Sequence, residues 1–93
     1  MVVKNITSGE SRRIDCEGIF VALGESSKSE LLQGQIELDE KGYIITAANM
    51  ATNIDGVFAA GDIVKKPLRQ IVTAAADGAT AAVSALAYIN KRK

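Results

Sequence analysis

The stretch GVFAAGD, residues 56–62, decides how this sequence is interpreted. A turn signal, Asp55-Gly56, precedes the apolar run 57–60, which is short enough for a buried strand. The run ends at Gly61, which lacks a Cβ, and at the carboxylate of Asp62. Ligands of open α/β sheets bind beyond the carboxyl ends of strands, and glycine allows a close approach to the backbone. The sequence therefore predicts a ligand site at Gly61 and Asp62.

A long amphipathic helix is predicted after this site. Its start is predicted near Lys65-Lys66-Pro67, because proline is tolerated in a first helical turn. The N–H groups of its first turn, near Arg69, Gln70 and Ile71, have no intrahelical partner and carry a partial positive charge. An ionised Asp62 accepts hydrogen bonds from hydroxyl groups, so a cofactor held by both would place a hydroxylated chain near Asp62 and a carbonyl edge near the helix start. Small and apolar residues recur at spacings of three and four over about 20 residues: Ile71, Ala75, Gly78, Ala79, Ala82, Leu86 and Ile89.

The residues before the quoted stretch indicate several strands. Residues 2–7 and 12–16 flank a turn at 8–10 and predict a β-hairpin, with Cys16 on its apolar side as a core residue. The apolar run 19–23 does not alternate, which is typical of a strand covered on both faces. A polar connector over residues 24–34 follows, and two further strands are then predicted at 36–38 and 43–46, joined through the turn at 39–42.

Composition excludes several classes of function. Eleven basic and eleven acidic residues cancel, and aromatic residues make up 4% of the 93 residues, which argues against a nucleic-acid partner. The chain has neither an unbroken apolar run of membrane-spanning length nor a signal-peptide pattern at its start, so we expect no membrane contact and a cytoplasmic location. A single cysteine and no histidine leave neither a catalytic nucleophile pair nor a metal site to predict.

Taken separately, these features are those of a turn, a packed helix and a solvated arginine. Their order and spacing, however, resemble the C-terminal end of bacterial-type thioredoxin reductases. The resemblance runs through the TSGE hairpin, EGIFVALG, GQIELDEKGYIIT, TNIDGVFAAGD and KPLRQIVTAAADGATAA, and so covers essentially the whole chain. The LRQ at residues 68–70 favours this family over the flavoproteins that reduce peroxiredoxins and over ferredoxin-NADP reductases.

The resemblance implies a fold and a set of site residues. The fold class is α/β, as part of a two-dinucleotide-binding, Rossmann-like fold with one long C-terminal helix. Residues 1–24 would be the tail of an NADPH-binding domain, and 25–93 the C-terminal part of an FAD-binding domain. Asp62, after Gly61, would hold the ribityl chain of FAD. Arg69, Gln70 and the Ile71 amide would lie beside the flavin.

The resemblance also implies what the chain lacks. The complete enzymes have two glycine-rich dinucleotide turns and a Cys-x-x-Cys motif that reacts with thioredoxin, and none of these occurs in the 93 residues. We therefore expect one side of a flavin site, inactive alone and with weak or no FAD binding, whose parent enzyme uses NADPH and a thioredoxin-like substrate. The alternative is a non-enzymatic domain that self-associates, for instance as a dimer, or binds a complementary N-terminal chain.

Overall fold

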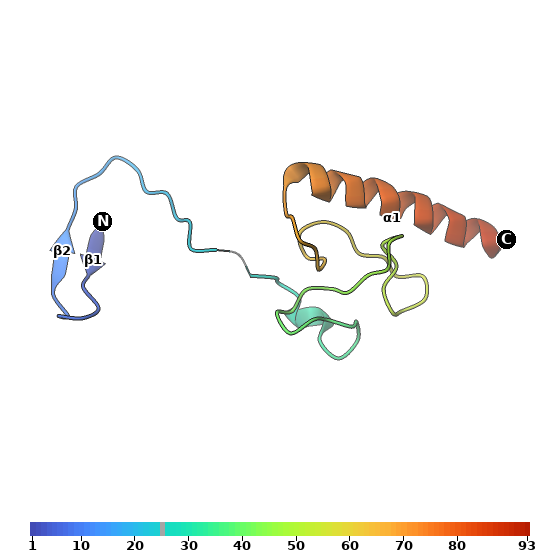
Figure 1. Cartoon of the computed structure of the whole chain (residues 1–93), viewed down its shortest axis with the longest axis horizontal. Coiled ribbons are helices and arrows are strands. Elements are labelled where there is room, and N and C mark those ends of the chain that lie inside the picture. The colour runs from blue at the N-terminus through green and yellow to red at the C-terminus, as the bar shows by residue number, and fades with distance from the viewer. Residues whose placement is uncertain (25) are drawn as a thin grey trace.

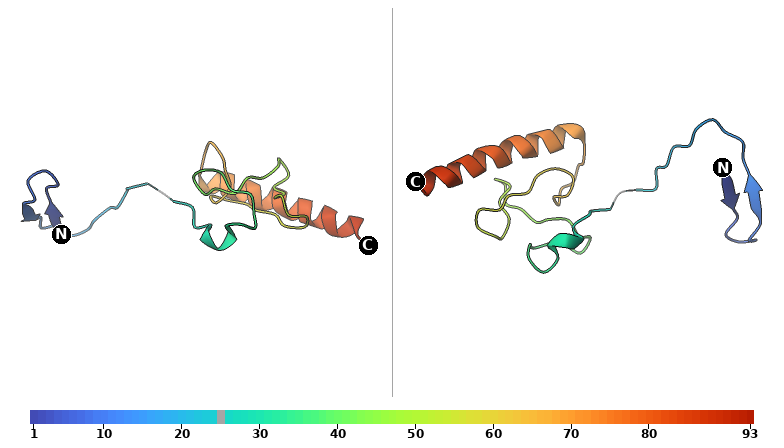
Figure 2. Two further views of the ribbon diagram at one scale, coloured as in Figure 1. Left: turned by 90° about the horizontal axis from the view of Figure 1, so that it is seen from below. Right: turned by 180° about the vertical axis from the view of Figure 1, so that it is seen from behind.

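The computed structural model describes residues 1–24 and 26–93. Its elements are the strands β1 (Val2–Lys4) and β2 (Ser11–Arg13), the short 3-10 helix η1 (Glu30–Leu32) and the helix α1 (Ile71–Lys91). The molecule is elongated, 65 × 29 × 20 Å, and its hairpin lies apart from the part that carries α1 (Figures 1 and 2). The division into domains at residues 24 and 25 stays a prediction, since residue 25 is outside the described residues.

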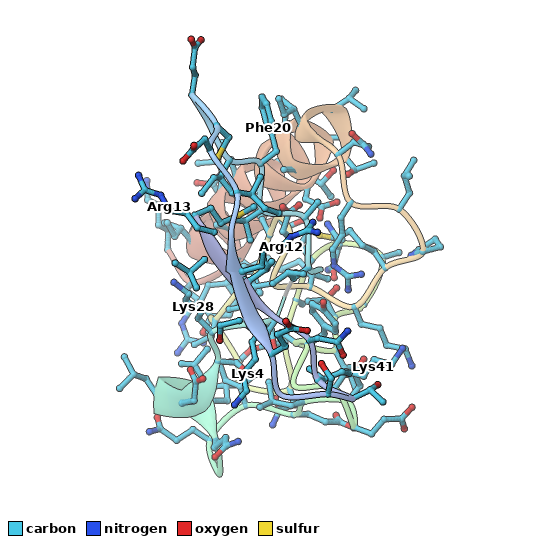
Figure 3. All side chains as sticks on the ribbon, turned by 90° about the vertical axis from the view of Figure 1, so that its left-hand side faces the viewer. Lys4, Arg12, Arg13, Phe20, Lys28 and Lys41 are labelled. Atoms are coloured by element: carbon cyan, nitrogen blue, oxygen red, sulfur yellow. The ribbon has the colours of Figure 1, made fainter. Side chains whose placement is uncertain are left out.

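The predicted hairpin is confirmed, with shorter strands. β1 and β2 pair antiparallel, with Val2 opposite Arg13 and Lys4 opposite Ser11. The turn is closed by the side chain of Asn5, whose Oδ1 accepts hydrogen bonds from the backbone of the next residues. Arg12 and Arg13 extend to opposite sides of β2 (Figure 3), as alternation along a strand requires.

Two predictions for this region are wrong. Residues 19–23 form no strand and are exposed, with the side chain of Phe20 fully accessible. Cys16 is exposed too, rather than a core residue. The physical reason is the same for both: within residues 1–24 and 26–93, the hairpin packs against no other helix or strand, so nothing covers these side chains.

The small core consists of Ile44, in the segment predicted as a strand at 43–46, and Val64 beside it. Ile44 pairs antiparallel with Leu38 and parallel with Val64, and Ile44 and Val64 are only 3% and 2% exposed. The turn between this segment and the one predicted as a strand at 36–38 forms as predicted, because Asp39 accepts hydrogen bonds from the Tyr43 N–H at 2.9 Å and from the Lys41 N–H. The pairing is confined to single residues and does not extend into continuous strands.

The quoted stretch likewise forms a single antiparallel pair, Phe58 with Ala51, instead of a continuous strand over 57–60. Gly56 has a positive φ of 81°, and a Cβ there would lie 3.0 Å from the hydroxyl of Tyr88. This turn therefore requires glycine, which lets α1 approach the loop closely.

The predicted helix is confirmed in place and length: α1 has 21 residues and begins at Ile71. Pro67 precedes it by four residues instead of lying in its first turn. One face of α1 packs against the rest of the chain, and its residues Asp77, Ala81 and Tyr88 are half-buried. The predicted small and apolar face is exposed along its whole length, with Ile71 90% and Leu86 58% accessible. We call this face, made of residues 71, 75, 78, 79, 82, 86 and 89, the open helix face.

α1 is also long and apolar enough to cross a membrane, judged by length and composition alone, with a mean hydropathy of 1.3 over its most apolar window. This is weak evidence for a membrane helix, because the core helix of a soluble protein has the same composition. The side of α1 that contacts the rest of the chain carries an ion pair, described below.

Candidate functional site

Four of the five predicted site residues line one cavity. Asp62, Arg69, Gln70 and Ile71 surround an open cavity of about 610 Å³, which Ala74 and Ala75 of α1 complete. Its size is within the range of small-molecule sites. The loop after residue 60 thus returns to the start of α1, as the ligand hypothesis requires.

Gly61, the fifth predicted residue, lies directly behind this cavity. Its φ is +89°, a conformation that side-chain-bearing residues rarely adopt. A Cβ built there would be 4.0 Å from the Cβ of Ala74, which is ordinary contact. Backbone conformation, more than space, therefore demands glycine at this position.

The start of α1 faces the cavity with a partly capped end. The Gln70 N–H donates to Oγ1 of Thr73 at 2.9 Å, and the same hydroxyl donates to the Gln70 carbonyl. Within the described residues, no acceptor is recorded for the N–H groups of Ile71 and Val72. Two amide donors and the positive end of the helix dipole are thus available to a ligand at this end.

Arg69 is held by the chain itself. Its Nε donates to the carbonyl of Asp62 at 3.0 Å, and one of its terminal nitrogens donates to the carbonyl of Val64 at 3.3 Å. Its guanidinium also lies 3.6 Å above the centre of the Tyr43 ring, a cation–π contact. Arg69 therefore fixes the backbone on the carbonyl side of Asp62, as well as lining the cavity.

Sequence reasoning missed an ion pair next to the site. Lys66 pairs with Asp77 of α1, and their side chains are only 10% and 18% exposed. The hydrogen bond from Lys66 is the largest cause that lowers the pKa of Asp77 below its ordinary value, and the Gly61 N–H lowers this pKa further. No signal for this pair was present in the sequence, because the apolar spacing placed Asp77 outside the predicted packing face of the helix.

This ion pair predicts a dependence of stability on pH. The lowered pKa means that the stabilisation from Asp77 is complete above the unfolded-state value of 3.8 and is lost as pH falls through the lower folded-state pKa. We expect Asp77→Asn to reduce the free energy of unfolding by about 1.5 kcal/mol at pH 6. The difference from wild type should shrink below about pH 4. Urea unfolding at pH 6, 4 and 3 measures it.

Asp55→Asn is the matched control, since Asp55 pairs with Arg92 at 3.6 Å at an exposed site. Surface pairs contribute little to stability, so this variant should follow the wild type at every pH. A wild-type advantage over Asp77→Asn that grows in acid would contradict the assignment.

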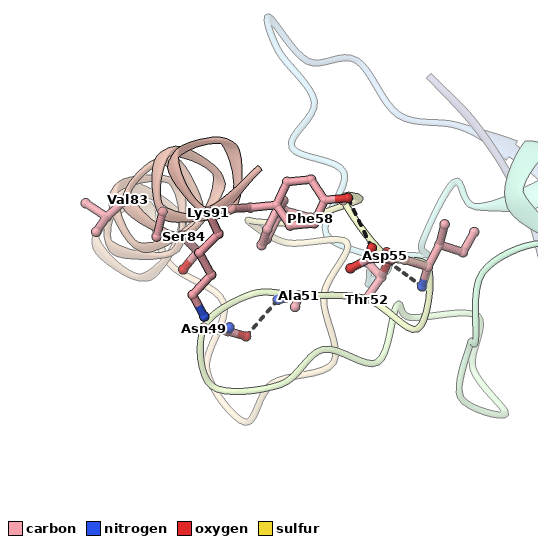
Figure 4. A pocket seen from close by; sticks show the side chains of 12 residues that line it. Asn49, Ala51, Thr52, Asp55, Phe58, Val83, Ser84 and Lys91 are labelled. Atoms are coloured by element: carbon pink, nitrogen blue, oxygen red, sulfur yellow. Dashed lines mark hydrogen bonds between the residues drawn. The ribbon is translucent and has the colours of Figure 1, made fainter. Parts of the chain in front are cut away.

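A second pocket of about 370 Å³ lies between the C-terminal half of α1 and the loop that carries Asn49, Thr52 and Asp55 (Figure 4). The hydroxyl of Tyr88 donates to Asp55 and accepts from Arg92. Partial burial is the largest cause that raises the pKa of Tyr88. The Phe58 ring packs edge-on against Tyr88, 6.3 Å between centres. These contacts attach the end of α1 to the loop, so we assign the pocket's polar groups a structural role.

Comparison with known proteins now identifies the family. The family model described as pyridine nucleotide-disulphide oxidoreductase matches residues 2–78, which is most of the chain. The chain belongs to this family. The resemblance to thioredoxin reductases found in the sequence is confirmed by curated relatives and by solved structures, and with it the FAD/NAD(P)-binding fold class.

Among the relatives, the thioredoxin reductase of Peptoclostridium litorale is 62% identical over 74 residues, which are 80% of this chain and 24% of that protein. The thioredoxin reductase of Peptoclostridium acidaminophilum is 51% identical over a match that covers 95% of this chain and 30% of that protein. The solved thioredoxin reductase of Lactococcus lactis superposes with a TM-score of 0.75 at 41% identity, over 97% of this chain and 30% of that one. This chain therefore spans less than a third of the length of each of these three proteins.

Proposed function

We propose that this chain forms one side of the flavin site of a thioredoxin-reductase-like FAD/NADPH disulfide oxidoreductase, and that it is inactive alone. A flavin in such an enzyme passes electrons from a nicotinamide to a disulfide. One observation carries the proposal: Asp62 and the start of α1 line the same cavity.

The chemistry of the lining residues fits a flavin. The Asp62 carboxylate accepts hydrogen bonds only, which suits the hydroxyl groups of a ribityl chain. The Ile71 and Val72 amides, with Gln70 at the N-cap, suit the N1/O2 edge of the isoalloxazine. This edge becomes more negative on reduction, and a helix N-terminus stabilises negative charge by about 0.3–1 kcal/mol, or up to about 2 in protected geometry.

This chain lines the cavity on one side only, so a bound flavin needs residues of another chain on its opposite side. A glycine-rich turn that binds the ADP part of FAD is not among the 93 residues. The exposed run 19–23 and the open helix face are among the apolar surfaces that a partner could cover. Uncovered apolar area of this kind marks association sites. We propose a complementary N-terminal chain as the occupant, with weak or no FAD binding before it docks.

The proposed domain assignment, substrate and location come from the family to which the chain belongs. Residues 1–24 would close the NADPH-binding domain and residues 25–93 the FAD-binding domain. The substrate of the assembled enzyme would be a thioredoxin-like protein. A cytoplasmic location belongs to the same proposal, because thiol reduction is chemistry of a reducing compartment.

The test uses the full 93-residue chain and the P. acidaminophilum relative from which the matching residues have been deleted, called here the complementary segment. We expect each alone to bind FAD weakly or not at all, and the mixture to quench flavin fluorescence and shift its absorbance bands. The mixture should also oxidise NADPH in the presence of a disulfide substrate, whereas the chain alone should not.

Self-association is the second candidate, and the same open helix face favours it. Sedimentation of the chain alone distinguishes the two. A dimer that dissociates when the complementary segment is added supports the first proposal. A stable dimer that neither binds FAD nor accepts the complementary segment supports a non-enzymatic domain instead.

A further inference from the structure

The ion pair of Lys66 and Asp77 lies behind the wall of the cavity that Asp62 lines. Lys66 belongs to the connector before α1, and Asp77 lies in the second turn of the helix. Both side chains are largely buried, which is costly for a charged group unless it is paired. An ordinary surface ion pair would not require this burial, so a further contact of the two charges is expected.

The backbone of the site loop supplies that contact. The N–H of Gly61 donates to Oδ2 of Asp77 at 3.2 Å, and Lys66 donates to the same oxygen. One carboxylate oxygen on α1 therefore holds the residue that precedes Asp62 and the side chain of a residue four positions after it. The loop between them is attached to the helix at both ends.

The other side of Asp62 is held as well. Arg69 Nε binds the carbonyl of Asp62, and the buried Val64, next along the loop, pairs with Ile44 in the core. The main chain is therefore held one residue before Asp62, at the Gly61 N–H, and at the Asp62 carbonyl, through Arg69. The side chain of Asp62, by contrast, stays exposed at the cavity.

We infer that Asp77, neutralised by Lys66, is a positioning residue that presents Asp62 to the flavin by holding the Ala60–Gly61 peptide, just before Asp62, against α1. This rests on the proposed function, in which Asp62 binds the ribityl hydroxyls. A ligand-binding group is effective when the residues behind it lock its geometry. Lys66 also cancels a negative charge that would otherwise lie close to the negative charge of Asp62.

The clamp itself is tested first, without flavin. Amide hydrogen exchange of Gly61 is followed by NMR in the full chain. We expect Asp77→Ala to speed exchange at Gly61 at least tenfold, because its acceptor is removed. Asp77→Asn keeps an oxygen for Gly61, so exchange at Gly61 should rise no more than exchange at protected amides elsewhere in the chain, which report the lower stability of this variant. Asp55→Asn, at the far end of α1, should leave Gly61 unchanged, and unaltered exchange in Asp77→Ala would overturn the clamp.

The role toward flavin is tested in the complex with the complementary segment. We expect Asp77→Ala to weaken FAD binding at least tenfold while the two chains associate as in wild type, and Asp77→Asn to restore most of the affinity. A purely structural ion pair would instead lower association or stability in Asp77→Ala and leave the FAD affinity of the assembled complex unchanged, which would overturn the inference.

The proposed function and the positioning role of Asp77 can fail independently. If the wild-type mixture binds no FAD, the proposed function is wrong, and the flavin role of Asp77 falls with it, while the exchange data still decide whether the clamp exists. If the wild-type mixture binds FAD and Asp77→Ala binds it equally well, the proposed function stands and the positioning role is wrong.

Should Asp77→Ala fail to fold, Lys66→Met, which leaves the Gly61 hydrogen bond in place, serves as the second variant. It should weaken FAD binding about threefold or more, and wild-type affinity would contradict the part assigned to Lys66.

Discussion

Ala82→Glu is expected to weaken association with the complementary segment at least 100-fold. Ala82 lies in the middle of the open helix face, which no part of the described chain covers. In the proposed complex this face packs against an apolar surface, so the substitution buries a carboxylate without a partner. An uncompensated buried charge costs about 3–5 kcal/mol. Isothermal titration calorimetry of the two chains measures the loss.

Ala76→Glu is the matched control for this experiment. Ala76 is an exposed alanine of the same helix, outside the open helix face. A glutamate there should leave association within about threefold of wild type. Both variants should keep the circular dichroism of the wild-type chain, since both sites are solvated before docking. Equal losses from the two variants, or none from either, would contradict docking through the open helix face.

The contrast between these two faces shows what periodicity predicts and what it does not. The spacing of Ile71, Ala75, Gly78 and Ala82 correctly predicted the helix and its length. It did not predict that the chain itself contacts the other side of α1, through Asp77 and its neighbours. An apolar pattern indicates that a face is buried in some assembly. It does not say whether the covering surface belongs to the same chain.

The run 19–23 illustrates the same limit. Its continuous apolar character predicts a strand covered on both faces, yet Phe20 and its neighbours are exposed in the described structure. A central strand needs partners on both edges and layers on both faces, and residues 1–24 and 26–93 supply none to this run. Cys16 was misassigned for the same reason.

The candidate site was more predictable, because it depends on local rules. A glycine and an acid after an apolar run, followed at a short distance by a helix start, predicted a ligand site, and the family resemblance assigned the roles of Arg69, Gln70 and Ile71. The structure brings these three residues and Asp62 around one cavity, and their binding of a cofactor stays a prediction. The contacts that hold them were not predictable. Neither the hydrogen bond from the Gly61 N–H to Asp77, sixteen residues away, nor the stacking of Arg69 on Tyr43 follows from sequence spacing.

Asp62→Ala is expected to weaken FAD binding by the complex about 10- to 150-fold. The estimate corresponds to one charge-assisted hydrogen bond, about 1.5–3 kcal/mol. Asp62 is exposed at the cavity, and its carboxylate has no hydrogen bond recorded within the described residues, so removing it should cost the free chain little stability. The loss should therefore appear in the FAD titration of the complex and not in urea unfolding of the chain.

Asp62→Asn separates charge from shape in the same titration. Its amide oxygen still accepts a hydrogen bond from a ribityl hydroxyl, but without the charge that strengthens it, so we expect an affinity between those of wild type and Asp62→Ala. Asp55 lies in the loop beside the C-terminal half of α1, away from the cavity, so Asp55→Ala should bind FAD as wild type does. If Asp62→Ala binds FAD with wild-type affinity in a complex that has assembled normally, Asp62 does not contact the cofactor. The cavity at the start of α1 would then need a different ligand, because the carboxylate and the helix N-terminus would no longer act on the same molecule.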